Sequence, residues 1–176
     1  MKELLLLRHA KSSWDDPQLD DFDRHLAERG RRAAPFMARE IARRGWLPDH
    51  VMVSPALRTR QTWELVSAEL SGVPEAVFHP QIYTDLADDL LQLVREAPES
   101  AARALLVGHN PALEEFAARL AGTGSDKKLM KRMRHKFPTA ALARLLVGEP
   151  WRDLSPGAAR LVDFLTPKDL SSRCPS

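Results

Sequence analysis

The sequence contains almost no cysteine and no long apolar run. Cys174 is the only cysteine among 176 residues, so no disulfide can form within the chain. Structural disulfides belong to oxidising compartments, and a chain without them is expected in a reduced, cytoplasmic setting. No apolar run is longer than the four leucines of residues 4–7. This is far below the roughly 18 residues of a membrane span and too short for a signal-peptide core, so we expect no membrane association.

Several catalytic motifs are also missing. The chain has no GxxxxGK[ST] sequence, which excludes a P-loop for nucleotides. It has no GxSxG elbow of a serine hydrolase, and neither HExxH nor the paired Cys and His spacing that indicates zinc. The formal net charge is only +2, which argues against a general affinity for polyanions.

What is present is an alternation of short apolar segments with longer amphipathic ones. Ser54-Pro55 and Asn110-Pro111 each predict a helix start, with a capping residue followed by proline in the first turn. Expected strands cover residues 3–7, 50–53, 76–79, 103–107, 139–147 and 159–165, and expected helices cover residues 25–44, 54–70, 86–96 and 110–120. The alternation predicts an α/β fold, a three-layer sandwich with a mostly parallel sheet and helices on both faces. We expect one domain over residues 1–167 and a flexible tail over residues 168–176.

Three of the expected strands end in conspicuous polar stretches. RHAKSSW follows the first strand, SPALRTRQT (54–62) the second and VGHNP (107–111) the fourth. In open α/β sheets ligands bind beyond the carboxyl ends of the strands. The side chains expected to converge there are Arg8, His9, Arg58 and His109. Two helix N-termini would add backbone N–H groups, so the sequence predicts an anion pocket of a size that suits a phosphoryl group.

A histidine is the candidate nucleophile for such a pocket. The position of Cys174 in the tail argues against a cysteine-thiolate phosphatase. A neutral imidazole is a good nucleophile near pH 7, because its unperturbed pKa is about 6.5.

Taken together, the motifs resemble those of a known family. LLLLRHAKSSW, SPALRTRQT and VGHNP, in this order, resemble the histidine phosphatase superfamily, whose signature is an RHG or RHA triplet after the first strand. Together with DFDRHLAERGRRAA (21–34) and FPTAALARLLV (137–147), they look like the short SixA-like phosphohistidine phosphatases along most of the chain.

The resemblance implies a role for each of the four side chains. His9 would attack phosphorus and carry a transient phosphohistidine, which requires a neutral ring with its second nitrogen donating to a backbone carbonyl. Arg8 and Arg58 would bind the phosphoryl oxygens through forked, permanently charged donors. His109 would complete the pocket as a cation. A helix N-terminus lowers the pKa of His109, so we expect bound phosphate to restore its charge. Neither a metal nor a cofactor is required.

The chain departs from larger family members, which carry a helical insertion over the pocket. Only 50 residues lie between Arg58 and His109, and the expected helix, strand, helix and strand use them. An open, shallow site suits a phosphoryl group displayed on a protein better than an enclosed metabolite.

A general acid for an ester leaving group has no diagnostic motif in this chain. The candidates Asp85 and Asp88 lie in IYTDLADDLL (82–91), where helix capping and first-turn acidity are the favoured explanation of both. A phosphoramidate P–N bond depends less on such an acid, because its nitrogen is protonated more easily than an ester oxygen.

Several residues near the motifs have more than one interpretation. Arg24 can edge the pocket, and His25 reads as a helix-entry residue. Ser12 and Ser13 either bind phosphate or lie in a solvated loop. The basic run KKLMKRMRHK (127–136) is either a solvated segment or a docking rim for an acidic phosphoprotein. It contains no aromatic residue to stack on bases, which argues against nucleic acid.

Three functions therefore stay open. The favoured one is a phosphatase that acts on phosphohistidine of a signalling or phosphotransfer protein. A small-molecule phosphomonoesterase would use the same pocket, and a clear acid at Asp85 or Asp88 would support it. A non-catalytic phosphate-binding module is disfavoured, because binding alone needs no nucleophile at His9.

Overall fold

The leucine run of residues 4–7 lies inside strand β1 (Lys2–Arg8), in the interior of a six-stranded sheet. All four leucines are fully buried. Leu4 and Leu6 belong to one apolar cluster and Leu5 and Leu7 to another, on the opposite face. A strand that is covered on both faces needs a continuous apolar run rather than an alternating one. The computed structural model describes residues 1–171.

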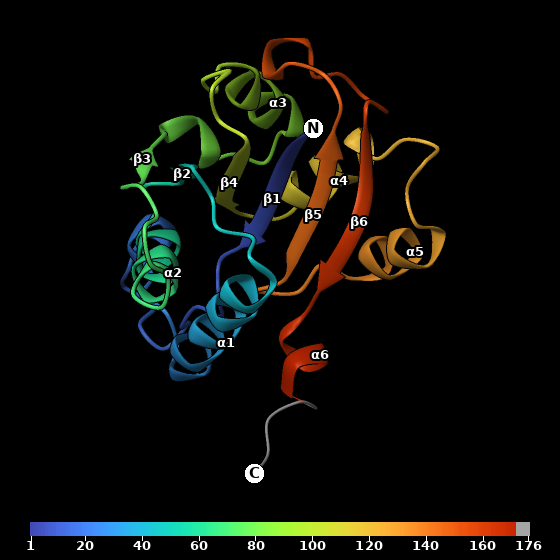
Figure 1. Cartoon of the computed structure of the whole chain (residues 1–176). Coiled ribbons are helices and arrows are strands. Elements are labelled where there is room, and N and C mark those ends of the chain that lie inside the picture. Colours follow the sequence, from blue (N-terminus) through green and yellow to red (C-terminus); the bar gives the residue numbers. More distant parts are fainter. Residues whose placement is uncertain (172–176) are drawn as a thin grey trace.

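Helices cover both faces of the sheet (Figure 1). The other described strands are β2 His50–Val53, β3 Val77–Phe78, β4 Arg103–Gly108, β5 Leu142–Val147 and β6 Ala159–Leu165, in the spatial order β3-β2-β4-β1-β5-β6. Helices α1 (Glu28–Arg44), α2 (Leu57–Ser67) and α6 (Pro167–Ser171) cover one face; α3 (Ala87–Arg95), α4 (Ala112–Leu120) and α5 (Lys127–His135) cover the other. The predicted three-layer α/β sandwich without a large cap is confirmed.

The strand directions bring several chain segments to one edge of the sheet, here called the carboxyl edge. Strands β1 to β4 pair in parallel, so β1, β2 and β4 end at this edge, where Arg8 is opposite Gly108. Strands β5 and β6 run antiparallel. Leu142, the first residue of β5, is opposite both Leu7 and Leu165. The start of β5 and the end of β6 therefore lie at the carboxyl edge as well.

Two predicted elements begin later than expected near this edge. Helix α1 begins at Glu28 rather than at residue 25, because residues 25–26 are extended and pair with residues 12–13. Strand β5 begins at Leu142 rather than at residue 139. The backbone turns at Ala140, whose N–H donates to the carbonyl oxygens of Arg8 and His9.

The predicted cap of the helix at residues 54–70 is wrong in its detail. Helix α2 begins at Leu57, and its N-cap is Ala56 rather than Ser54. The Ser54 hydroxyl accepts the backbone N–H of Ala56 and lies 2.7 Å from His109 Nε2. The Ser54 hydroxyl, which was expected to cap a helix, therefore binds a histidine at the carboxyl edge instead.

The chain beyond β6 is only in part as predicted. Residues 167–171 form α6, and its Leu170 is buried in the cluster under α1, so the first residues of the predicted tail are folded. The rest of that prediction, together with Cys174, lies outside the described residues. No described helix is long and apolar enough to cross a membrane.

Candidate active site

His9 lies directly after β1, almost completely buried at the carboxyl edge. Its backbone N–H donates to Gly108 of β4 at 3.1 Å. Its ring Nδ1 lies 2.7 Å from the Ala10 carbonyl oxygen. A carbonyl oxygen can only accept, so Nδ1 carries the proton and Nε2 keeps its lone pair. This is the neutral tautomer that a nucleophilic role requires.

Arg8 is held beside His9 by the loop that precedes β5. Its Nη1 donates to the Phe137 carbonyl oxygen at 2.9 Å, and the Asn110 side chain donates to the same oxygen at 3.0 Å. Ala140, which fixes the carbonyls of Arg8 and His9, has a φ of 61°. This left-handed conformation is uncommon for alanine, and the hydrogen bonds around it maintain it.

His109 follows β4 and contacts His9 with the two rings tilted by 53° and their centroids 5.4 Å apart. The Tyr83 ring lies at the same distance on another side. His109 Nε2 bonds the Ser54 hydroxyl, so the ends of β2 and β4 are joined through two side chains. The predicted meeting of two histidines at one edge therefore occurs in the structure.

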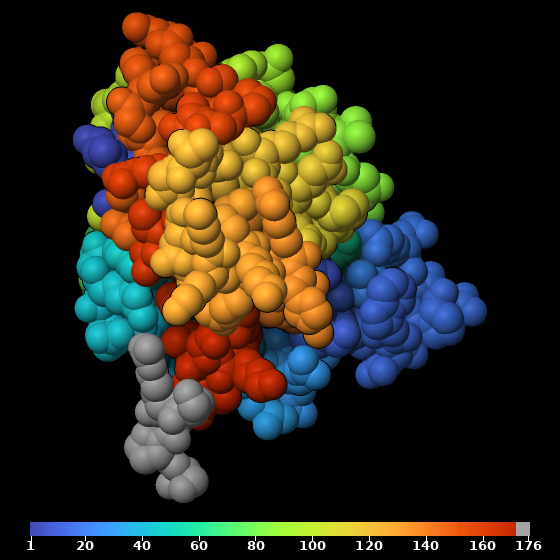
Figure 2. Space-filling view, turned by 90° about the vertical axis from the view of Figure 1, so that its right-hand side faces the viewer, coloured from blue at the N-terminus to red at the C-terminus, as the bar shows by residue number. Residues whose placement is uncertain are grey.

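Arg58, in the first turn of α2, is buried and points to a carboxylate that the sequence analysis did not single out. Its Nη1 donates to the backbone oxygen of Asp21 at 2.6 Å and its Nη2 to Asp21 Oδ2 at 3.0 Å. Arg24 Nε donates to Oδ1 at 3.1 Å, and the Tyr83 hydroxyl donates to Oδ2 at 2.6 Å. Asp21 thus ties the segment between β1 and α1, which projects from the body in blue in Figure 2, to α2.

Burial raises the pKa of Asp21, but the hydrogen bonds from Tyr83 and Arg58 outweigh it and lower the pKa to about 2. Burial also lowers the pKa of His9 to about 3, with His109 and the neighbouring arginines acting in the same direction. Burial and then the charge of Arg58 lower the pKa of His109 to about 3. Near pH 7 the site therefore holds two neutral imidazoles, one carboxylate and the charged guanidiniums.

Buried polar atoms without partners gather at this place. Among residues 1–171, four buried side-chain polar atoms have no hydrogen-bond partner, and three of them are Arg8 Nε, Arg58 Nε and His109 Nδ1. Buried polar groups are almost always paired in folded proteins. Two guanidinium donors and an imidazole nitrogen that can carry a proton match an anion with several acceptor oxygens, such as a phosphoryl group.

A hollow of about 280 Å³ opens beside Arg58 and His109, whereas His9 and Arg8 do not line it. Its lining residues are Asp21, Arg58, Tyr83, Thr84, Asp85, His109 and Asn110. Asp85, one candidate acid, therefore faces the hollow. Asp88, the other, is paired with Arg119 on α4 and does not line it. In the described part of the chain, no three His, Cys, Asp or Glu side chains cluster in a way that could hold a metal ion.

Arg24 does not line the hollow, but it binds Asp21, which does, and it organises the neighbouring loop. Its Nη1 donates to the Ser12 hydroxyl at 2.7 Å, and its guanidinium lies 3.5 Å from the centre of the exposed Trp14 ring. Ser13 Oγ accepts from the backbone of Asp15. His25 lies before the helix, with Nδ1 at 2.9 Å from its neighbour's carbonyl. The two serines thus serve the loop in this structure.

Comparison with known proteins gives consistent similarities. Residues 4–83 match the family model described as histidine phosphatase superfamily (branch 1). The chain is 31% identical to the putative phosphohistidine phosphatase SixA from Agrobacterium tumefaciens, with a TM-score of 0.79 over 94% of this chain and 97% of that one. It is 32% identical to an uncharacterized protein of Mycobacterium tuberculosis, over 92% of this chain and 100% of that protein. An uncharacterized chloroplastic protein of Arabidopsis thaliana is 31% identical, over 94% of this chain and 78% of that protein.

Proposed function

This chain belongs to the histidine phosphatase superfamily, in its SixA-like branch, and we propose that it removes the phosphoryl group from phosphohistidine on a signalling or phosphotransfer protein. The observation that carries the proposal is the set of unpartnered polar atoms of Arg8, Arg58 and His109 in the neighbourhood of His9, whose ring centroid lies 5.4 Å from that of His109. The single cysteine of the chain supports a cytoplasmic location.

The reaction proceeds in two displacements at phosphorus. In the first, the lone pair of His9 Nε2 forms a bond to phosphorus while the P–N bond of the substrate breaks. The electron pair of that bond stays on the substrate imidazole, which takes a proton from water. In the second, water attacks phosphorus, the bond to Nε2 breaks with its electron pair returning to His9, and the proton of water passes to solvent. Inorganic phosphate and neutral His9 remain.

The cations stabilise the charge on the transferring group. Phosphoryl transfer depends mainly on positioning and on charge stabilisation. Arg8 and Arg58 supply permanent charges, and His109 supplies a donor that becomes cationic when the phosphoryl group is bound. The hydrogen bond from Nδ1 to Ala10 keeps the ring of His9 oriented and its reactive nitrogen unprotonated.

The choice of phosphohistidine rests on the leaving group and on the open site. Asp21 has a pKa of about 2 and is ionised near pH 7, so it cannot protonate an ester oxygen, and Asp85 is the one candidate acid of the sequence that lines the hollow. A phosphoramidate nitrogen needs less help from an enzyme acid. No cap insertion covers the hollow, which leaves room for a phosphoryl group on a protein surface.

The test is phosphate release from a histidine-phosphorylated carrier protein, with simple phosphomonoesters in parallel and a chelator present. We expect fast release from the phosphohistidine protein by the wild type and loss of it in His9→Ala. His50→Gln, at the opposite end of β2, is the control for the loss of a histidine. Turnover of esters alone would instead support a small-molecule phosphomonoesterase with Asp85 as its acid. Activity that survives His9→Ala would exclude the nucleophile.

A further inference from the structure

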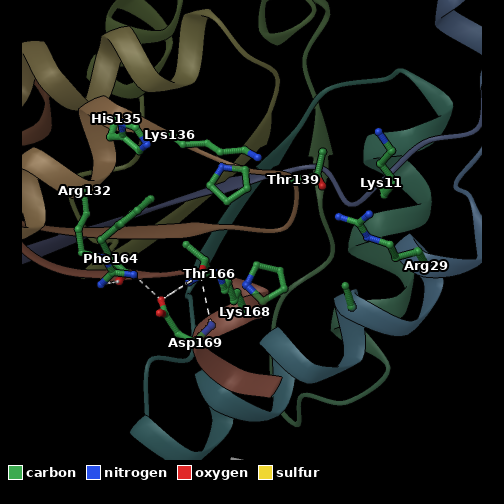
Figure 3. Close-up of a pocket in the computed structure, with 13 residues that line it drawn as sticks. Lys11, Arg29, Arg132, His135, Lys136, Thr139, Phe164, Thr166, Lys168 and Asp169 are labelled. Carbon is green, nitrogen blue, oxygen red and sulfur yellow. Dashed lines mark hydrogen bonds and ion pairs between the residues drawn. The ribbon is translucent and has the colours of Figure 1, made fainter. Parts of the chain in front are cut away.

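A second concave region, here called the basic cleft, lies at the carboxyl edge and has a volume of about 500 Å³. Figure 3 shows Lys11 and Arg29 on one side of it and Arg132, His135 and Lys136 on the other. Its lining residues are Lys11, Arg29, Ala33, Arg132, His135, Lys136, Pro138, Thr139, Phe164, Thr166, Pro167, Lys168 and Asp169. Five lysines or arginines thus face one acidic side chain, in a protein whose formal net charge is only +2.

The charge of the cleft is not neutralised by the described part of the chain. Its acid, Asp169, already binds Arg132 Nη2 at 2.6 Å and the backbone N–H of Thr166. Several exposed arginines elsewhere have acidic partners, as in Arg32 with Glu28, Arg39 with Glu69 and Arg119 with Asp88. No ion pair within residues 1–171 involves the side chains of Lys11, Arg29, Lys136 or Lys168. Gathering like charges is unfavourable unless an anion binds between them.

The basic cleft adjoins the candidate active site along the sheet edge. Phe164, near the end of β6, and Pro138, before β5, are among its lining residues, and Lys11 is two residues beyond His9. The loop before β5 belongs to both places: the Phe137 carbonyl holds Arg8, while the neighbours Lys136 and Pro138 line the cleft. In Figure 2, α5 in light orange and the end of the described chain in red lie next to each other on this face.

The residues that line the cleft indicate which kind of anion fits. Four of them are apolar, namely Ala33, Pro138, Phe164 and Pro167, and Phe164 among these is buried. A compact phosphate site typically uses free N–H groups at a helix start. The start of α6 lines the cleft, but the N–H of Thr166 donates to the Asp169 carboxylate and the N–H of Asp169 to the Thr166 carbonyl oxygen. Long cations beside partly exposed apolar residues suit a polypeptide segment that carries carboxylates and an apolar side chain.

We infer that the basic cleft docks an acidic segment of the protein that carries the phosphohistidine, with an apolar side chain of that segment on Pro138 and Pro167, which are both partly exposed. The inference rests on the proposed function and adds to it a selection of substrates by charge outside the catalytic hollow. Binding there holds the substrate beside His9 and lowers KM, while the chemical step at phosphorus stays unchanged.

The experiment uses two phosphohistidine peptides that differ only in the flanking segment. One flank contains Asp, Glu and Leu, and the other has Gln and Ser in their place. Phosphoramidate serves as a small P–N substrate without a peptide. The cleft variant is Arg29→Glu with Lys168→Glu, and the control with the same charge change is Arg39→Glu with Arg152→Glu, two exposed positions outside the cleft.

We expect the wild type to turn over the acidic peptide with a KM lower by about ten-fold than that of the neutral peptide, and high salt to remove the difference. The cleft variant should lose this preference and the control should keep it, while both hydrolyse phosphoramidate like the wild type. Equal KM values for the two peptides in the wild type, or a preference that survives in the cleft variant, would overturn the inference.

Direct binding separates this inference from the proposed function. If the wild type hydrolyses no P–N substrate, the proposed function fails, and fluorescence anisotropy of the unphosphorylated acidic peptide still reports on the cleft. Binding that is lost in the cleft variant alone would support docking. Binding of ATP that is tighter than that of the peptide, and lost in the same variant, would overturn it in favour of a small polyanion.

Discussion

Arg58 directs both of its terminal nitrogens to Asp21, one to the backbone oxygen and one to the carboxylate. The nitrogen that remains, Nε, is buried and has no partner. The Asp21 carboxylate is therefore bound to Arg58, the residue that is proposed to bind a phosphoryl oxygen. It orients the guanidinium, and its negative charge opposes the approach of an anionic substrate. Asp21 thus affects positioning and affinity in opposite directions.

Replacing Asp21 by Asn should separate these two effects. The amide oxygen can still accept from Arg58, but the negative charge is gone. We expect inorganic phosphate to bind roughly three- to ten-fold more tightly, the scale of one charge interaction in a half-exposed site. Isothermal titration of phosphate measures this. Asp23→Asn, in the same short helical turn and exposed, should leave the affinity unchanged. Equal or weaker binding by Asp21→Asn would contradict the argument.

Replacing Arg58 by Lys should lower kcat/KM for a phosphohistidine substrate by about 10²–10³-fold, the usual effect of removing one donor to a developing anion. A lysine keeps the charge but cannot hold Asp21 with two nitrogens and offer a third to phosphate. Arg60→Lys, on the exposed side of the same helix, is the matched control and should retain full activity. A similar loss in both variants would point to a damaged helix rather than to a missing donor.

The main parts of the site were predictable because each one stands at a strand end. The leucine run defines β1, so Arg8 and His9 had to lie at its carboxyl end, and the two X-Pro signals placed Arg58 and His109 near the same edge. Asp21 was not predictable in this way. It is one of several acids in its loop, and its partners Arg58 and Tyr83 are 37 and 62 residues away. Only the tertiary structure distinguishes it from Asp23.

Contacts between residues that are distant in the sequence also explain the errors in the predicted helix ends and why the sequence predicted only part of the basic cleft. Ser54 followed by proline is a sound helix signal, but its hydroxyl binds His109, and that contact spans 55 residues. The basic run at residues 127–136 was visible in the sequence and forms α5. Its role depends on Lys11, Arg29 and Lys168, which lie far from it in the chain and give no local signal.

Replacing Gly30 by Ala should damage the loop that follows His9. A Cβ at this position would overlap the backbone oxygen of Lys11, which also accepts the N–H of Ala27. Backbone cannot move aside as a side chain can, so we expect a loss of about 1–3 kcal/mol in the free energy of unfolding. Gly148→Ala is the control, because no atom lies within 4 Å of the Cβ there. Urea unfolding of both variants measures the difference.

The stability of the protein should fall as the pH drops below about 6.5. Burial lowers the pKa of His9 and His109 to about 3 in the folded state, against an ordinary value of about 6.5 in the unfolded chain. Between these two pKa values the unfolded state binds more protons than the folded state. The free energy of unfolding therefore decreases as the pH decreases, by up to about 1.4 kcal/mol per pH unit for each histidine.

The measurement is urea unfolding from pH 7 to pH 5. The free energy of unfolding should depend less steeply on pH in the double variant His9→Gln, His109→Gln than in the wild type. His50 and His79, whose pKa values burial also lowers, keep part of the slope. An unchanged slope would mean that neither catalytic histidine is held neutral.

Phosphate binding should take up a proton near pH 7, and this separates His109 from His9. Without an anion, burial and Arg58 keep His109 neutral. A phosphate dianion bound between Arg8 and Arg58 offsets their positive charge and therefore raises the pKa of His109. The imidazole ring then binds a second proton. Both of its nitrogens, including the unpartnered Nδ1, become donors. Affinity should therefore fall as the pH rises above 7. Titration calorimetry in two buffers of different ionisation enthalpy measures the protons taken up per phosphate. Phosphate itself can release a proton on binding, so the contribution of the ring is the difference between the wild type and His109→Gln. We expect the wild type to take up more protons per phosphate than His109→Gln, and His50→Gln to match the wild type. Equal values for the wild type and His109→Gln would show that His109 acts as a neutral donor, and the charge stabilisation would then fall to the two arginines.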